Sequence, residues 1–285
     1  MAALRVGWIG LGAMGAPLAA HVAAAGFDLV VWSRSGRGLE RVPGATVVAG
    51  PRAVAEAADV VVTMLAGPDD VAAVWDELLA AAGPGRVLVD LTTSSASLAE
   101  RLAERAAAAG ATALDAPVTG GRKGAEDGTL GLMVGGDAAA LATARPVLAT
   151  FARAIHHLGG PGRGQLAKAV NQLAVAGVMQ GLAEALALAR AAGLPRESVL
   201  DVLASGTARS FLLDAYGEKM LAGDRTPGFA VRTFLKDLRL AEAALAERGL
   251  AAPGVAATRA LYAALDADGR GDEGIQALID ALDHP

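Results

Sequence analysis

Residues 4–15 read LRVGWIGLGAMG, an apolar run that passes directly into three glycines with the spacing G-x-G-x-x-G. Leu4–Ile9 predicts a buried strand, and the residues after the last glycine predict a helix whose first N–H groups favour an anion. Such turns also occur without a ligand. In a nucleotide-binding turn the first glycine permits the tight bend, the second lets the backbone approach a pyrophosphate, and the third lets the helix pack closely. The stretch therefore predicts that dinucleotide phosphates bind at Gly10, Leu11, Gly12, Ala13, Met14 and Gly15.

The end of the second expected strand, Phe27–Trp32, distinguishes the two nicotinamide dinucleotides. NAD sites usually place a carboxylate there for the ribose 2′-hydroxyl, and Asp28 stands at the opposite end of this strand. An arginine in that place can donate two parallel hydrogen bonds to a 2′-phosphate, although a loop arginine can also simply be solvated. We therefore expect NADP as cofactor and regard NAD as less favoured, with the 2′-phosphate beside Ser33, Arg34 and Ser35.

The composition argues against several other classes of protein. The chain has 285 residues, enough for two domains, and its net charge of −5 gives no sign of nucleic-acid binding. It contains no cysteine, which removes disulfides and thiolate chemistry. The uncharged segment 6–27 is interrupted by glycines and Pro17, so we expect no membrane segment and a cytoplasmic protein. We also expect no metal site, because no pair with metal-ligand spacing occurs among His21, His156, His157 and His284.

The order of strand and helix patterns predicts an α/β fold. In the first half, strands expected at 46–48, 59–65, 86–91 and 111–116 alternate with helical stretches such as 97–109, which is typical of a parallel sheet covered on both faces. Later residues predict helices at 165–192, 196–204, 211–222, 234–248, 255–265 and 273–282. We expect a doubly wound Rossmann domain over residues 1–162, an all-helical domain over 163–285, and the active site in the cleft between them.

Loops that follow the strands of a doubly wound sheet face the ligand. Met64 and Leu65 lie at the end of the strand expected at 59–65, and Thr93 follows the strand expected at 86–91. These residues are candidate neighbours of the cofactor, although most residues at strand ends only turn the chain.

The helix expected from Gln165 carries the best candidate for catalysis. Lys168, Asn171 and Gln172 are spaced three and four residues apart, so their side chains share one helix face. The helix then continues without charge to Ala183, which predicts burial at a domain or subunit junction. A partly desolvated lysine can donate a proton or stabilise a developing alkoxide. The simpler alternative is a lysine that reaches solvent from the start of the helix.

Four segments together resemble the β-hydroxyacid dehydrogenases, the family of 3-hydroxyisobutyrate dehydrogenase, tartronate semialdehyde reductase and the glyoxylate/succinic semialdehyde reductases. They occur in the order of that family and read GWIGLGAMG at 7–15, DAPVTGG at 115–121, GRGQLAKAVNQ at 162–172 and KDL at 236–238. The resemblance covers nearly the whole chain.

The resemblance implies a role for each matching residue. Lys168 would exchange a proton with the carbonyl oxygen while NADP exchanges a hydride with the substrate. Other residues would bind the substrate carboxylate (Thr119, Gly120, Gly121), orient substrate and lysine (Asn171, Gln172), lie near the nicotinamide ribose (Thr93) or contact the cofactor (Lys236). Simpler roles stay open for three of them, namely a turn residue at Thr119, an ion pair between Lys236 and Asp237, and a buried backbone contact at Gln172.

The motifs leave the substrate open within one class, a small β-hydroxyacid or its semialdehyde. Residues 122–128 resemble the glyoxylate/succinic semialdehyde reductases, whereas Asn171-Gln172 is more similar to the tartronate branch. Arg122 and Lys123 are either solvated or recognise a second anionic group of the substrate. Phe211 and Phe234 are either core residues or walls of the pocket.

Two other functions stay open. The first is an imine reductase-like NADPH enzyme, a group in which Asp or Tyr typically stands at the position of Lys168. The second is a non-catalytic NADP-binding module. A 6-phosphogluconate dehydrogenase would need a much longer helical domain. The apolar helix faces also predict a homodimer or homotetramer.

Overall fold

The computed structural model describes residues 4–283 and divides into two compact units. The boundary between them lies at Lys168/Ala169, six residues beyond the boundary placed at 162/163 from the sequence. The first unit contains an α/β sheet and the second is helical, so the expected fold class is confirmed.

The first unit is built on a sheet with nine strands within residues 4–283, in the order β3-β2-β1-β4-β5-β6-β8-β7, while β9 pairs with β8. Their bounds are β1 (Arg5–Ile9), β2 (Asp28–Trp32), β3 (Thr46–Val47), β4 (Val60–Thr63), β5 (Val87–Asp90), β6 (Thr112–Asp115), β7 (Val118–Thr119), β8 (Leu130–Gly136) and β9 (Ala152–His157). The strands from β3 to β6 pair in parallel. Strand β8 runs antiparallel to β6 and β7, so the sheet is mostly rather than wholly parallel.

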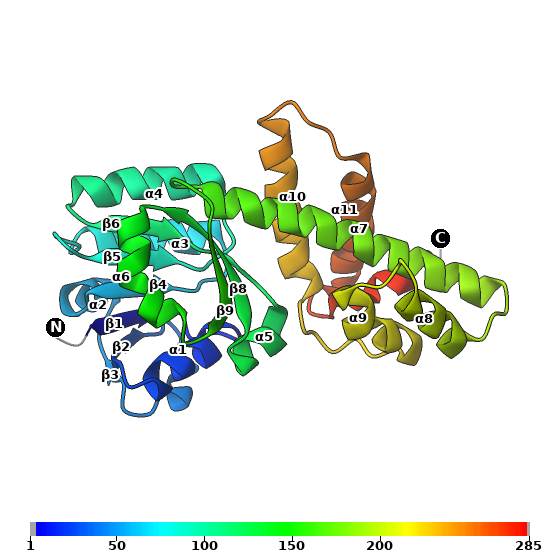
Figure 1. Ribbon diagram of the computed structural model, residues 1–285, viewed down its shortest axis with the longest axis horizontal. Coiled ribbons are helices and arrows are strands. Elements are labelled where there is room, and N and C mark those ends of the chain that lie inside the picture. Colours follow the sequence, from blue (N-terminus) through cyan, green and yellow to red (C-terminus); the bar gives the residue numbers. More distant parts are fainter. Residues whose placement is uncertain (1–3, 284–285) are drawn as a thin grey trace. The chain divides into compact units, whose positions relative to one another are not determined.

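Helices cover both faces of this sheet, and Figure 1 shows the central strands between them. Their bounds are α1 (Gly15–Ala24), α2 (Pro51–Ala57), α3 (Pro68–Leu79), α4 (Ala96–Ala108), α5 (Gly121–Asp127) and α6 (Ala138–Leu148). Side chains alternate along each strand: Trp8 packs in the core formed with α1 and α6, whereas its neighbour Ile9 packs with α2, α3 and α4. The sheet is therefore packed against a buried core on each of its two faces.

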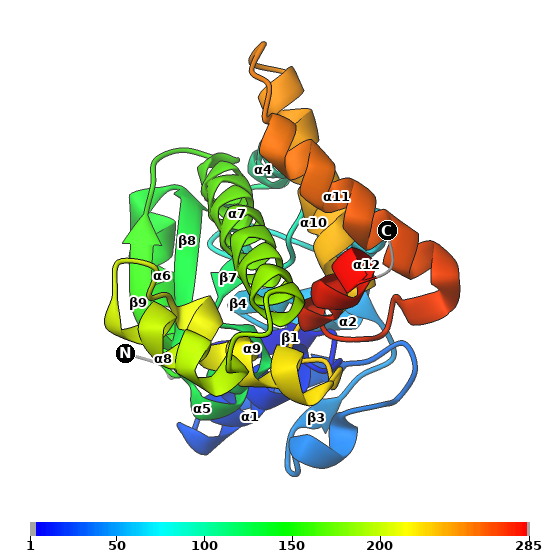
Figure 2. The ribbon, with the colours of Figure 1, turned by 90° about the vertical axis from the view of Figure 1, so that its right-hand side faces the viewer.

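The second unit consists of helices joined by short loops. They are α7 (Arg163–Ala191, whose first turns belong to the first unit), α8 (Arg196–Ser205), α9 (Phe211–Ala222), α10 (Val231–Ala246), α11 (Pro253–Leu265), a π-helical turn (Asp266–Arg270), a 3-10 helix (Ile275–Ile279) and α12 (Asp280–Asp283). In Figure 2, α10 and α11 lie side by side. Phe234 is fully buried in the core of this unit, with its ring edge-on to Tyr262 at a centroid distance of 5.2 Å. Phe211, by contrast, is exposed.

The prediction of a single helix at 273–282 is wrong. A 3-10 helix occupies Ile275–Ile279, and only Asp280–Asp283 is α-helical. The Gln276 side chain contacts the loop after α9: its Nε2 donates to the carbonyl oxygens of Asp224 and Thr226 at 2.9 and 3.0 Å. These contacts, made about 50 residues away along the chain, anchor the tighter turn.

Candidate active site

At the glycine turn between β1 and α1, the backbone lies close to its neighbours on one side and is open on the other. Gly10 has a φ of 95°, and a Cβ there would overlap the Met64 carbonyl oxygen, while a Cβ on Gly15 would overlap the carbonyl oxygen of Gly10. At Gly12 a Cβ would meet no described atom within 4 Å, so the turn is open on that side. No described side chain caps the first turn of α1, which also lacks acidic residues. The open glycine, the uncapped helix and the absence of negative charge in that turn fit a dinucleotide phosphate.

Two loops predicted to adjoin the cofactor meet this turn. Met64 N donates to the Ile9 carbonyl oxygen at 2.9 Å, directly before the glycines. Leu65 N donates to Thr92 Oγ1, also at 2.9 Å, which ties the loop after β4 to the loop after β5. Thr93, half-buried, is the next residue of that loop. The structure therefore places Met64, Leu65 and Thr93 at the edge of the sheet where the glycine turn lies.

The loop after β2 brings Arg34 to the same edge. Gly10 N donates to the Trp32 carbonyl oxygen at 3.3 Å, and Ser33 Oγ donates to the Arg37 carbonyl oxygen at 2.9 Å. The Arg34 guanidinium is exposed and pairs with Asp70, Nη1 to Oδ1, at 2.8 Å. We did not single out Asp70 from the sequence. The sequence signal that could have identified Asp70 was its position in the first turn of the helix that follows β4.

Lys168 is held beside the segment predicted to bind the substrate carboxylate. Its side chain is 7% exposed, and its Nζ donates to the Val118 carbonyl oxygen at 2.9 Å. Thr119 is the next residue, followed by Gly120 and Gly121 with φ values of 125° and 63°, a conformation that favours glycine. The predicted lysine and the predicted Thr-Gly-Gly segment are thus brought together, although 46 residues lie between Gly121 and Lys168 in the sequence.

A buried carboxylate that we did not predict as a site residue supports the start of α7. Asp115 accepts hydrogen bonds from the backbone N–H groups of Gly162 and Gln165, both at 2.8 Å. Burial raises the pKa of Asp115 from 3.8 to about 6, against the opposing effect of these hydrogen bonds. The Gln165 side chain in turn accepts from Ser94 N and donates to the Thr92 carbonyl oxygen, both at 2.8 Å.

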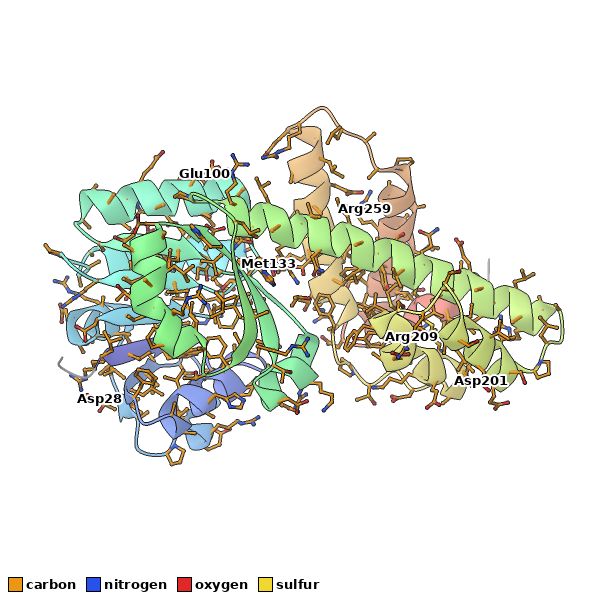
Figure 3. The ribbon with its side chains drawn as sticks, in the orientation of Figure 1. Asp28, Glu100, Met133, Asp201, Arg209 and Arg259 are labelled. Carbon is orange, nitrogen blue, oxygen red and sulfur yellow. The ribbon has the colours of Figure 1, made fainter. Side chains whose placement is uncertain are left out.

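The tight packing at this helix start is visible in the glycine contacts. A Cβ on Gly164 would overlap the carbonyl oxygen of Met133, which lies on β8 and is labelled in Figure 3. A Cβ on Gly162 would lie 2.9 Å from an oxygen of Glu100 on α4, labelled in the same figure. The sequence signal was that Asp115 and Gln165 both lie within the family-like segments at 115–121 and 162–172.

In the second unit, Asp237 joins two of the predicted site residues. Gln172 Nε2 donates to Asp237 Oδ2 at 2.8 Å, and Lys236 Nζ lies 3.0 Å from Asp237 Oδ1. Gln172 and Asp237 are both buried. The Oδ1 atom of Asn171 is buried and has no hydrogen-bond partner among the described residues, which leaves it available to a ligand.

The charged residues of α5 are paired within that helix. Arg122 contacts Glu126 at 3.1 Å and Lys123 contacts Asp127 at 2.7 Å, each four residues further along. Within residues 4–283, no group of three or more histidine and acidic side chains could hold a metal ion. His21 Nε2 lies 3.2 and 3.0 Å from two carbonyl oxygens of α5, and His284 lies outside the described residues.

Comparisons with known proteins identify the family. Residues 5–159 match the family described as the NAD-binding domain of 6-phosphogluconate dehydrogenase, and residues 162–282 match the one described as NAD-binding of NADP-dependent 3-hydroxyisobutyrate dehydrogenase. The chain is 39% identical over 285 residues to a probable 3-hydroxyisobutyrate dehydrogenase-like protein of Arabidopsis thaliana, covering 98% of this chain and 85% of that one. It is 35% identical to 2-(hydroxymethyl)glutarate dehydrogenase of Eubacterium barkeri, covering 97% and 94%.

A solved structure extends the likeness to three dimensions. The 3-hydroxyisobutyrate dehydrogenase of Mycobacterium tuberculosis, determined with L-serine, superimposes with a TM-score of 0.91 at 34% identity, covering 98% of this chain and 99% of that one. The resemblance noted from the four motifs is confirmed. The chain belongs to the β-hydroxyacid dehydrogenase family, and is a hydroxyacid oxidoreductase that uses a nicotinamide cofactor.

Proposed function

We propose that this protein is an NADP-dependent oxidoreductase that interconverts a small β-hydroxyacid and its semialdehyde, with Lys168 as the general acid and base. The observation that carries the proposal is the placement of Lys168. Its ammonium is almost fully buried and is held 2.9 Å from the Val118 carbonyl oxygen, next to Thr119. A buried ammonium held by a backbone oxygen can give a proton to a substrate oxygen within the same small space.

The residues near Lys168 in the sequence motifs would bind and orient the substrate. Thr119, Gly120 and Gly121 would hold the substrate carboxylate by a hydroxyl and by backbone N–H groups. The free Oδ1 of Asn171 would orient the substrate, and Gln172, fixed by Asp237, would hold that part of the helix. When bound, the nicotinamide supplies or accepts the hydride at the carbonyl carbon. In reduction Lys168 gives its proton to the carbonyl oxygen, which becomes the hydroxyl, and in oxidation it takes that proton back.

The preference for NADP rests on Arg34. Arg34 lies two residues after β2, whose last residue, Trp32, accepts a hydrogen bond from Gly10 N. The 2′-substituent of the adenosine ribose is expected at this end of the strand. The second family match is also described as NADP-dependent. We further propose Ser33 and Ser35 as partners of the 2′-phosphate, the residues Gly10–Gly15 with Met64, Leu65 and Thr93 as the remaining contacts in the first unit, and Lys236 as a contact from the helical unit.

The names of the relatives narrow the substrate class. 3-Hydroxyisobutyrate, L-serine and 2-(hydroxymethyl)glutarate, which those names contain, all carry a CH₂OH group on the carbon that bears the carboxylate. They differ in the other substituent of that carbon. We propose a substrate of this kind, a 3-hydroxypropanoate substituted at carbon 2, whose oxidation yields an aldehyde acid.

Initial rates with purified protein test the proposal. NADPH and NADH are each assayed with methylmalonate semialdehyde, tartronate semialdehyde, glyoxylate and succinic semialdehyde. Lys168→Ala should lower kcat about 10²- to 10⁴-fold, as expected for loss of a general acid. The matched control is Lys219→Ala on α9, whose partner is Asp224 at 3.6 Å, and it should keep the wild-type rate. Full activity of Lys168→Ala would refute the role of the lysine.

The same assay separates the other two functions. Reduction of cyclic imines without reduction of any aldehyde acid would favour the imine reductase-like enzyme. Tight binding of NADPH without turnover of either substrate class would favour the non-catalytic module.

We also propose a cytoplasmic, self-associating protein with neither nucleic acid nor membrane as partner. Among the described helices, α7 is long and apolar enough to cross a membrane by length and composition. Its residues Ala176, Met179, Leu182, Ala183 and Leu186, however, belong to the core of the helical unit. High-speed centrifugation of a cell lysate should leave the protein in the supernatant without detergent.

A further inference from the structure

Strand β6 and the segment after it hold α7 at two places. At the end of β6, the Asp115 carboxylate binds the N–H groups of Gly162 and Gln165 at 2.8 Å each. Three residues further along the chain, the Val118 carbonyl oxygen binds Lys168 Nζ at 2.9 Å. Gln165 and Lys168 are themselves three residues apart, or about one helical turn. The two backbone contacts fix the start of the helix, and the side-chain contact about one turn further on fixes the Lys168 ammonium.

The backbone of β8 and of the α7 start packs closely against the Asp115 carboxylate. A Cβ on Gly135 would lie 2.5 Å from Asp115 Oδ1, and one on Gly164 would lie 2.8 Å from Oδ2. Asp115 itself is 5% exposed. The Gln165 side chain bridges to Ser94 and Thr92 on the other side. On the side of β8 and the helix start, the two N–H groups therefore have no room for an acceptor other than Asp115.

We propose that Asp115 is a positioning residue, whose carboxylate sets the place of the Lys168 ammonium through the first turn of α7. The inference rests on the proposed function, because it assigns Asp115 a part in the chemistry of Lys168. An ionised carboxylate suits this place, since it accepts both N–H groups and faces the positive end of the helix dipole. Proton transfer depends on sub-ångström placement of the donor, so a shifted helix start lowers the rate even when the fold is intact.

Asp115→Asn tests the proposal with little change in size. The amide offers one acceptor instead of two and turns an NH₂ group toward a backbone N–H. We expect kcat to fall about tenfold to a hundredfold, while KM for NADPH stays within about twofold. The matched control is Asp137→Asn. Asp137 accepts the N–H groups of Ala139 and Ala140 at 2.9 and 2.8 Å at the start of α6, a helix that does not carry the lysine. Its kcat should equal that of the wild type.

A second readout is independent of catalysis. Trace acetylation with acetic anhydride, measured by mass spectrometry, gives the reactivity of Lys168 relative to Lys123 and Lys219 in the same molecule. Asp115→Asn should raise this ratio severalfold, and Asp137→Asn should leave it unchanged. If Asp115→Asn does not fold, Asp115→Ser replaces it, because the smaller side chain leaves room for a water molecule.

The outcomes separate the inference from the function on which it rests. An unchanged acetylation ratio, or an unchanged kcat, in a folded Asp115 variant would overturn the positioning role. If the wild type reduces none of the aldehyde acids, the proposed function fails, and the acetylation ratio alone decides whether Asp115 places the lysine.

Discussion

Arg34 and Asp70 form a charge pair where the cofactor preference is expected to be decided. A carboxylate 2.8 Å from the guanidinium competes with a 2′-phosphate for the same N–H groups and repels its charge. Asp70→Asn should therefore lower KM for NADPH about fivefold, the effect of an exposed charge pair, and leave KM for NADH unchanged. Asp69→Asn, one residue earlier on α3 and exposed, is the control. Equal KM values for NADPH in wild type and Asp70→Asn would contradict this competition.

Removing the guanidinium should act in the opposite direction. Arg34→Ala is expected to raise KM for NADPH about tenfold to a hundredfold, the value of a charge-assisted hydrogen bond, with little effect on KM for NADH. Steady-state rates with both cofactors measure it. A better rate with NADH in the wild type would instead show that Arg34 does not select the phosphate.

Two buried carboxylates give the folded state a pH-dependent stability. Burial raises the pKa of Asp90 and of its strand partner Asp115 from 3.8 to about 6. Between these values the folded protein holds protons that the unfolded chain has released, so the free energy of unfolding rises as pH falls through 6 toward 4. From pH 7 to pH 5 each group should add about 1 kcal/mol.

Urea unfolding at the two pH values measures this gain in stability. Asp90→Asn should show about half the wild-type gain, because one titrating group remains. A wild type that is less stable at pH 5 than at pH 7 would contradict raised pKa values for the pair.

The junction of β8 and α7 depends on glycine. Because a Cβ at position 164 has no space beside Met133 and Asp115, Gly164→Ala should cost about 1–3 kcal/mol of stability, as overpacking does. It should also lower kcat, since it displaces the helix that carries Lys168. Gly254→Ala, in the first turn of α11, is the control, because a Cβ there meets no described atom within 4 Å. Urea unfolding of both variants, compared with wild type, decides the point.

Local patterns predicted most elements but not all. The strands β1 to β6 and the helices α7 to α11 follow from apolar runs and helical spacing, with ends shifted by only a few residues. Strands β7, β8 and β9 were not predicted, since β7 has two residues, β8 contains three glycines, and β9 reads ARAIHH. These strands exist because each pairs with a neighbour, a condition that no short window of sequence contains.

The candidate site also has residues that local patterns predicted and residues that depend on contacts distant in the sequence. Motif spacing led to the glycine turn, Arg34 and Lys168, whose roles each belong to one segment. Asp70 and Asp115 act on partners that lie 36 and 50 residues away, so their contacts could be recognised only once the chain was folded.

Several large apolar side chains of the helical unit are exposed, Leu188 and Val202 among them. Leu188 on α7 is 70% exposed and Val202 on α8 is 69% exposed. If a second copy of the chain covers Leu188, Leu188→Glu should shift the sedimentation coefficient toward that of a monomer. Leu250→Glu, at an exposed leucine in the loop between α10 and α11, should not. An unchanged coefficient in both variants would place any self-association elsewhere.

The three tryptophans, at positions 8, 32 and 75, all belong to the first unit, and the two tyrosines, at 216 and 262, belong to the second. Trp8 Nε1 donates to the Gly10 carbonyl oxygen at 3.1 Å, inside the glycine turn. Indole emission therefore comes from the sheet unit alone, because indole can be excited at wavelengths that tyrosine does not absorb. An optical change at the nucleotide turn can thus be recorded in an unlabelled sample without any turnover.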